Sequence, residues 1–430
     1  MSDPTEKVPA TPPASEPTTT LRSDAETPKA PKESRSGSLA RDILSGTWLV
    51  SILAVVIALV LGAILIALAD PRVQETAGYI FARPGDFFGA VWDKVSAAYS
   101  ALFRGAIFDW QANSAVRSIR PLTESLVFAT PLILAGLAVA IPFRAGMFNI
   151  GGQGQVVLGA LTAGWIGYSL SLPPVVHLLV ALLGGMVGGA LYASIAGFLK
   201  ARTGANEVIV TIMLNNIAAY LILYLLKQNW FTGTGSPLPQ SPPVASTASL
   251  PLLLNPPFRL HFGFIIAILA TVFVWWLMER STVGFEFRAA GANPRAARSA
   301  GISVNKVIVL VMVVAGAFAG LAGANQVLGT EAKLTTGIAG SLGFDAITVA
   351  LLGRSRPLGT FLSGLLFGAL KAGGYVMQSQ TGTPIDIVLV VQSIIVLLVA
   401  APPLVRAIFR LPAPGAKPRK TTLKAKEVAA

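Results

Sequence analysis

Long apolar runs, separated by short polar stretches, dominate the sequence. Nine runs of about 20 residues can each cross a hydrocarbon core of about 30 Å as an α-helix. They lie at 47–69, 121–142, 152–170, 174–199, 207–226, 261–279, 306–327, 358–378 and 386–406. A shorter run, 344–353, predicts a half-helix or re-entrant segment whose backbone ends need cover. If it counts as a crossing, the pattern predicts an all-α polytopic membrane protein with about ten transmembrane helices.

The composition agrees with this pattern and excludes several classes of function. Of the 430 residues, 53% are hydrophobic and 12% are charged, whereas soluble domains are about 25% charged. The chain has no cysteine, which excludes disulfides, thiol nucleophiles and thiolate metal sites, and its two histidines lie at the edges of apolar runs. It also has no G-x-x-x-x-G-K-[ST] phosphate loop. We therefore expect no bound metal or cofactor, and no ATP hydrolysis by this chain.

The two ends of the chain differ from its apolar middle. Residues 1–46 are rich in Pro, Ser and Thr and have almost no large apolar side chains, which predicts disorder. The first run ends in Ala67-Leu68-Ala69, like a signal-peptidase site, but the preceding tail and the run are both too long for a signal peptide. The sequence thus predicts a disordered cytoplasmic tail at 1–46, a transmembrane domain at 47–410 and a basic cytoplasmic tail at 411–430.

Basic residues concentrate on one side of the ten-crossing arrangement. They lie after residue 401, in the loop at 279–306, and in short turns near 200 and 355. The opposite side has a charge-balanced connection at 70–120 and a Pro-rich loop at 227–260. The positive-inside rule then places both termini in the cytoplasm. It also explains the net charge of +13 without nucleic acid, for which no aromatic-interleaved basic surface is present.

Two segments 179 residues apart resemble each other. LLGGMVGGALYA at 182–193 aligns with FLSGLLFGALKA at 361–372, and the pattern of Gly and Ala coincides. The two runs are fourth and ninth in the count, so the copies point in opposite directions across the membrane. This predicts an inverted repeat, which places a substrate path between the halves. The small residues also allow close helix packing, and the two interpretations are compatible.

Polar side chains inside apolar runs are costly and mark candidate functional positions. Glycines interrupt the segment RAGMFNIGGQGQ, which carries Asn149, Gln153 and Gln155. Asn215 and Asn216 lie within the fifth run, and Asp345 begins the short one. Amides suit a neutral polar solute better than an ion, so these six residues are candidates for a substrate path. The alternative is that they only cap broken helices.

Other polar and charged residues lie in or near the apolar runs. Asn325, Gln326, Lys371 and Gln392 are weaker path candidates, because each could instead bridge helices or reach the interface. Glu331 and Lys333 are close to Asp345 in sequence. We expect Asp345 to pair with Lys333 and so to hold the half-helix in place.

The loop FEFRAAGANPRAARSAGI, at 285–302, predicts a short displayed helix. Asn293 is a suitable cap and Pro294 a suitable first residue for a helix at 295–300, which Gly301 would end. Such a helix fits a groove on a cytoplasmic partner protein. The predicted docking residues are Arg288, Gly291, Asn293, Pro294, Arg295, Arg298 and Gly301. The alternative is an inert basic loop.

Four stretches carry a resemblance to a known family. GMFNIGGQGQ, NEVIVTIMLNNIA, GANPRAARSAGI and GFDAITVALLG resemble the permease subunits of ABC importers for branched-chain amino acids, ribose and nucleosides, most of all the nucleoside branch. The resemblance covers about 120–400. It implies a type II importer fold, a heterodimer with a second permease, cytoplasmic ATP-binding subunits, an extracytoplasmic substrate-binding lipoprotein, and a coupling helix within 291–301. Many relatives carry Glu where this chain has Gln153, which puts an essential carboxylate there in doubt.

The resulting hypothesis is a permease subunit of an ATP-driven importer in the cell membrane, with nucleosides as the preferred cargo. Simple sugars and branched-chain amino acids are alternatives within the same class. A secondary transporter is an alternative of another class, because broken inverted repeats suit it too. An intramembrane enzyme is disfavoured, since no paired acids, His dyad or thiol occur.

Overall fold

The computed structural model describes residues 47–232 and 238–409, and the regular structure in these ranges is helical apart from two isolated β-bridges. The helices are α2 Thr47–Leu68, α3 Pro71–Ala77, α4 Pro84–Ala106, α5 Ala115–Arg144, α6 Gly152–Ser169, α7 Pro174–Thr203, α8 Glu207–Leu225, α9 Asn229–Thr232, α10 Gly263–Arg280, α11 Thr282–Ala292, α12 Pro294–Ser299, α13 Val304–Asn325, the π-helix η1 Gln326–Glu331, α14 Leu342–Leu352, α15 Pro357–Thr381, α16 Asp386–Ala400 and α17 Pro402–Ile408. The expected tails at 1–46 and 411–430 lie outside the described residues.

The predicted helices form, but the count of ten full spans is not confirmed. By length and hydropathy, six helices of the described chain can cross a membrane: α5, α7, α8, α10, α13 with η1, and α15. The first apolar run is bent by 78° where α2 gives way to α3, and counting this pair gives up to seven spans. The short run forms α14, an 11-residue helix, as expected for a half-helix.

The last apolar run is broken, which corrects the expected span at 386–406. The helix α16 ends at Ala400, and α17 begins at Pro402. Two consecutive prolines cause the break, because proline lacks an amide hydrogen and restricts the residue before it. Ala401 accordingly leaves helical geometry, with φ −115° and ψ 67°.

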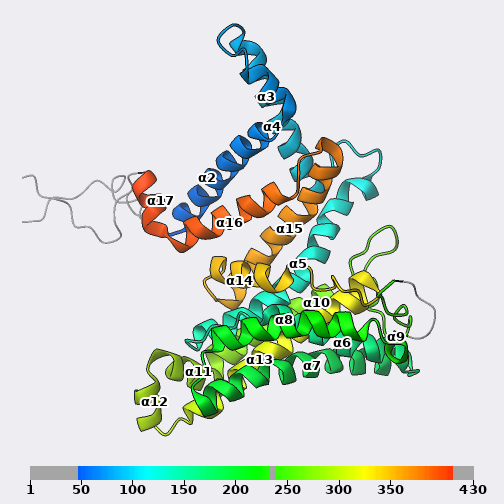
Figure 1. The fold of residues 1–430 in the computed structure, drawn as a ribbon, viewed down its shortest axis with the longest axis vertical. Helices are drawn as coiled ribbons and strands as arrows, with labels where there is room; N and C mark the ends of the chain where they lie inside the picture. Colours follow the sequence, from blue (N-terminus) through cyan, green and yellow to red (C-terminus); the bar gives the residue numbers. More distant parts are fainter. Residues whose placement is uncertain (1–46, 233–237, 410–430) are drawn as a thin grey trace, which may run out of the picture.

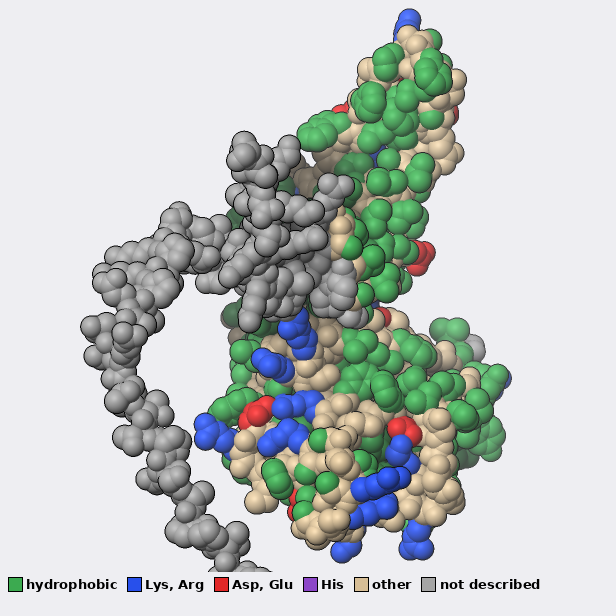
Figure 2. Space-filling model, turned by 90° about the vertical axis from the view of Figure 1, so that its left-hand side faces the viewer, with side chains coloured by type: hydrophobic (Ala, Val, Ile, Leu, Met, Phe, Trp, Pro, Cys, Tyr) green, Lys and Arg blue, Asp and Glu red, His purple; other side chains and the backbone are tan. Residues whose placement is uncertain are grey.

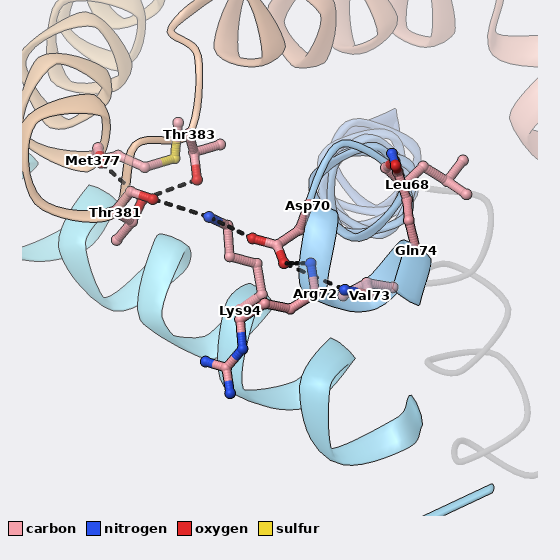
Figure 3. A network of polar contacts seen from close by, with 9 residues as sticks. All are labelled: Leu68, Asp70, Arg72, Val73, Gln74, Lys94, Met377, Thr381 and Thr383. Atoms are coloured by element: carbon pink, nitrogen blue, oxygen red, sulfur yellow. Dashed lines mark hydrogen bonds and ion pairs between the residues drawn. The ribbon is translucent and has the colours of Figure 1, made fainter. Parts of the chain in front are cut away.

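The connection at 70–120, which showed no apolar run, contains two helices. Asp70 caps α3 by accepting hydrogen bonds from the backbone amides of Arg72 and Val73 (Figure 3). The Lys94 ammonium on α4 contacts the Asp70 carboxylate at 2.8 Å and donates to the Thr381 carbonyl at 2.9 Å. One lysine therefore ties α4 both to the corner between α2 and α3 and to the end of α15.

The two halves of the repeat are packed into each other. α7 of the first half lies on α13 of the second, and α15 of the second half lies on α5 of the first. Equivalent glycines of the repeat make equivalent contacts. In the first half, Gly189 packs on Gly316 and Gly185 packs on Gly320. In the second half, Gly368 packs on Ala129 and Gly364 packs on Ile133. The partner positions are also equivalent, because the separation in sequence from Ala129 to Gly316 equals that from Ile133 to Gly320. This repetition of one contact supports an inverted repeat whose halves exchange helices.

The molecule has two opposite faces that matter for function. In Figure 1, α12, α17 and the beginning of α2 lie toward the left, while α9 lies at the right. Figure 2 looks onto that left-hand side and shows Lys and Arg gathered over the lower part of the molecule, with few acidic residues. Lys and Arg thus gather on the face that carries α12.

Candidate functional site

The N-termini of two interrupted helices, α6 and α14, meet inside the helix bundle. Gln153, in the first turn of α6, accepts a hydrogen bond from the backbone amide of Gly343 at 2.8 Å and donates one to the carbonyl of Gly340 at 2.6 Å. A Cβ atom on Gly343 would lie 2.2 Å from the Gln153 nitrogen, so only glycine permits this approach. We call this contact the junction. Both helices direct the positive ends of their dipoles toward it.

The junction lies within the thickness of the bundle. Asn215, close to the middle of α8, accepts from the amide of Gly154 at 2.8 Å and donates to the carbonyl of Ile150 at 2.9 Å. The 11 residues of α14 extend about 16 Å from the junction, which is about half of a hydrocarbon core. The backbone groups released where the two helices are interrupted are therefore bonded to side-chain amides of Gln153 and Asn215.

Asn149 and Gln155 form a separate, closed pair beside the junction. Their amide groups bond each other twice, at 2.9 Å in both directions, and Asn149 also accepts from the Gly151 amide at 3.1 Å. Both side chains are buried. With their hydrogen bonds satisfied in this way, they hold the segment before α6 rather than face a cavity.

Two other candidate residues lie apart from the junction. Asn216 is on the exposed side of α8 and donates only along its own helix, to the Ile212 carbonyl at 3.1 Å. Asp345 accepts from the Ser341 hydroxyl at 2.7 Å and meets the Lys371 ammonium at 3.4 Å. The expected pairing of Asp345 with Lys333 is therefore wrong: Asp345 instead connects α14 to α15, because Lys371 projects from the helix packed beside it.

A cavity of about 300 Å³ adjoins the junction, and only part of its lining was indicated by the sequence. It lies between α5, η1, the segment 337–342 and α15, and its lining includes Gly340, whose carbonyl accepts from Gln153. Gln326 and Lys371 line it, and both were weaker candidates in the sequence. Phe128, Arg259 and Tyr375 also line it, but an aromatic residue in a span and an arginine in a loop carry no distinctive pattern.

The predicted short helix is present, with the predicted cap. The Asn293 side chain accepts from the amides of Arg295 and Ala296, each at 3.1 Å, and Pro294 is the first residue of α12. Arg295 and Arg298 are exposed. Gly301 adopts φ +83°, a left-handed conformation that favours glycine and ends the helix.

The segment carrying α12 contacts the segment that leads to the junction. Gly291, at the end of α11, lies so close to residues 145–146 that an added Cβ would be 2.4 Å from the Ala145 carbonyl carbon. Gly146 has φ +68° and lies against Gly291 in return. Three residues farther along this segment is Asn149. A displacement of α11 and α12 can therefore be passed to the start of α6 through backbone contacts.

Residues 122–400 match the family described as branched-chain amino acid transport system, permease component. That stretch contains the junction, the cavity and α12. The chain belongs to this permease family. No solved structure matches it.

Several curated permeases are similar to the chain over most of its length. It is 41% identical to the guanosine ABC transporter permease protein NupP of Bacillus subtilis, over 71% of this chain and 86% of the relative. It is 39% identical to the glucose ABC transporter permease protein TsgB13 of Haloferax volcanii, over 64% and 75%. It is 35% identical to the nucleoside ABC transporter permease protein NupB of Lactococcus lactis, over 72% and 86%.

These matches establish the class of the protein as a multi-pass membrane subunit of an ABC transporter. An ABC transporter subunit is therefore preferred over the two alternatives from the sequence, a secondary transporter and an intramembrane enzyme. A second permease protein of B. subtilis and one of L. lactis also match, at 25% and 26% identity. Permeases of this kind thus occur in pairs, which indicates that this permease partners with a second one. Among the described residues, no three His, Asp or Glu side chains gather in a way that could hold a metal ion.

Proposed function

We propose that this permease imports nucleosides across the cell membrane as one half of a heterodimer, with ATP hydrolysed by cytoplasmic ATP-binding subunits and cargo delivered by an extracytoplasmic lipoprotein. The observation that carries the nucleoside assignment is the similarity to the guanosine permease, at 41% identity over 71% of the chain. The nucleoside permease of L. lactis supports it from an independent organism.

The junction has the chemistry of a gate for a neutral polar solute. Gln153 closes it with two hydrogen bonds from an uncharged amide, and Asn215 supports the helix end behind it. An amide can exchange backbone partners for the hydroxyls and ring nitrogens of a passing solute without leaving a charge buried. The proposed substrate path runs past Gln153 and Asn215, with Asn149, Gln155 and Asp345 positioning the segments on either side. Asn216 belongs to the path only if the partner permease covers α8.

The basic face is proposed to be cytoplasmic, which gives α12 its role. The positive-inside rule assigns the face with most Lys and Arg to the cytoplasm. α12 lies on that face, with Arg295 and Arg298 exposed for an acidic partner groove. In this assignment α12 is the coupling helix that docks on an ATP-binding subunit, and the Gly291–Gly146 contact carries its movement to the junction.

Uptake measurements test the cargo directly. Labelled guanosine, glucose and leucine are given to cells with this gene, to cells without it, and to cells whose only copy carries Gln153→Ala. Uptake of each compound is compared among the three strains. We expect deletion to abolish guanosine uptake, while glucose and leucine uptake stay unchanged. Loss of glucose or leucine uptake with normal guanosine uptake would overturn the nucleoside assignment and leave the permease assignment standing.

Glucose is the second candidate cargo, and one observation favours it. The H. volcanii relative named a glucose permease is 39% identical, nearly as similar as the guanosine permease. Because the two relatives differ in named cargo but not in similarity, overall identity does not separate a nucleoside from a hexose. Side chains at the cavity can separate them.

A further inference from the structure

The cavity beside the junction has an aromatic wall. The rings of Phe128 on α5 and Tyr375 on α15 are stacked, with centroids 5.5 Å apart and planes 26° apart. Phe128 is partly buried beneath Tyr375, whereas 48% of Tyr375 is exposed. The stack therefore fixes the orientation of the Tyr375 ring, which lines the cavity together with Phe128. A flat ring is the ligand that such a surface favours.

Another part of the lining is polar and carries mixed charge. The π-helix η1 contributes Gln326 and Glu331, whose side chains approach each other at 3.4 Å. Arg259 and Lys371 also line the cavity, and each has an acidic partner: Glu124 for Arg259 and Asp345 for Lys371. Since the charges are of both signs and the cations are paired, this wall suits hydroxyl groups better than an anion or a cation. π-helices also recur at functional sites.

The size and position of the cavity complete the argument. Its volume, about 300 Å³, is at the lower end of the range for small-molecule sites. Its lining includes Gly340, whose carbonyl accepts the hydrogen bond from Gln153. A solute held in the cavity thus lies next to the hydrogen bond between Gln153 and Gly340, which must open for the solute to pass.

We propose that this cavity is a substrate-binding antechamber that holds a nucleoside before the junction, with the base stacked on Tyr375 and the ribose hydroxyls facing Gln326 and Glu331. The proposal rests on nucleoside import as the function of the permease. It makes Tyr375 the residue that distinguishes a nucleoside from a hexose, because a sugar has hydroxyls for the polar wall but no ring for the aromatic one.

Equilibrium binding of labelled guanosine to the purified transporter complex in nanodiscs, without the binding protein, tests the antechamber. Tyr375→Leu should weaken guanosine binding about tenfold or more, as expected from loss of one stacked base, whereas Tyr375→Phe should retain it within about threefold. Tyr220→Leu is the matched control, because Tyr220 is an exposed aromatic residue of α8 that does not line the cavity. Each variant should elute from size-exclusion chromatography at the volume of the unaltered complex, which shows that it folds and assembles.

A second variant addresses the polar wall. Gln326→Ala should weaken binding of guanosine several-fold, and it should weaken binding of the free base guanine much less, since the base has no ribose. If Tyr375→Leu and Gln326→Ala bind guanosine as the unaltered complex does, the antechamber is overturned while nucleoside uptake by the cells still supports the proposed function. If the unaltered complex binds glucose and not guanosine, and cells lose glucose uptake without the gene, the proposed function fails as well.

Discussion

At the scale of single residues, the polar positions that the sequence singled out have unequal tasks. Asn149 and Gln155 satisfy each other, Asn216 bonds along its own helix, and only Gln153 and Asn215 bond backbone groups of another segment. The sequence could identify them as a group because buried amides are costly in a membrane. It could not sort them, because sorting depends on which segment lies opposite, and Gly343 is 190 residues away from Gln153.

The first prediction concerns Gln153. Gln153→Ala should reduce guanosine uptake at least about tenfold without reducing the amount of permease in the membrane, because it leaves the Gly343 amide and the Gly340 carbonyl without their shared partner. Gln153→Glu keeps the acceptor for Gly343 and should retain much more transport. Uptake is measured in proteoliposomes with the complete complex. Equal transport by Gln153→Ala and the unaltered permease would show that the junction is not on the path.

The second prediction concerns His261. Burial, together with the nearby Arg259, lowers the pKa of His261 to about 4. Between pH 6.5 and 4 the unfolded chain binds a proton at this residue and the folded chain does not, so stability falls as the pH falls, by up to about 1.4 kcal/mol per pH unit. His261→Gln should therefore lose less thermal stability between pH 7 and 5 than the unaltered permease. Parallel losses in the two proteins would contradict this.

At the scale of elements, the sequence predicted best the helices whose length and apolar character are required for crossing a membrane. Apolar length located most helices, and Asn293 with Pro294 located α12, because capping is local chemistry. It missed α4, whose apolar residues lie on one face of a helix and never form a run. The sequence also predicted one continuous helix across Pro402, although the helix is interrupted there because proline lacks an amide hydrogen. Elements fixed by contacts between distant segments, such as the Lys94 tie, have no signal in one sequence.

A third prediction tests the exchanged packing. Gly189→Leu should strongly reduce the amount of folded permease, because a Cβ there would already lie 2.3 Å from the backbone oxygen of Gly316. Overpacking of this kind costs about 1–3 kcal/mol or more. Gly89→Leu on α4 is the control, since nothing lies within 4 Å of its Cβ position. The amount of permease in purified membranes is the measurement, and equal amounts of both variants would contradict the contact.

A fourth prediction concerns α12. The double variant Arg295→Glu, Arg298→Glu should abolish transport and leave membrane insertion intact, because exposed arginines contribute little to folding but can determine how partner proteins fit. The same variant should bind the ATP-binding subunits less tightly in a pull-down from detergent. Normal transport by reconstituted vesicles would remove α12 from the coupling role.

At the scale of the whole molecule, the division between a basic face and an opposite face organises every functional assignment. The loop 238–262 and α9 lie away from α12 (Figure 1), and Arg259 of this loop lines the cavity beside the junction. If the basic face is cytoplasmic, a solute reaches the antechamber first, then the junction, and last the face where α12 docks. The direction of transport is thus tied to the orientation of the chain.

The fifth prediction tests this orientation. The chain has no cysteine, so single replacements report without background. In intact cells, an impermeant maleimide should label Asn255→Cys and should not label Ala296→Cys, although both positions are exposed. After the membrane is permeabilised, both should react. External labelling at residue 296 would invert the proposed topology.

The exchange of helices between the halves also bears on how the protein is made. The glycine face of α7 has its partner on α13, which ends more than 100 residues later. At about 5–20 residues per second, the ribosome takes roughly 6 to 25 s to synthesise that distance. During this interval α7 is in the bilayer with its closest packing surface uncovered, and α5 waits still longer for α15. The first half is incomplete when it leaves the ribosome, so the permease can reach its final packing only after nearly all of its helices have been inserted.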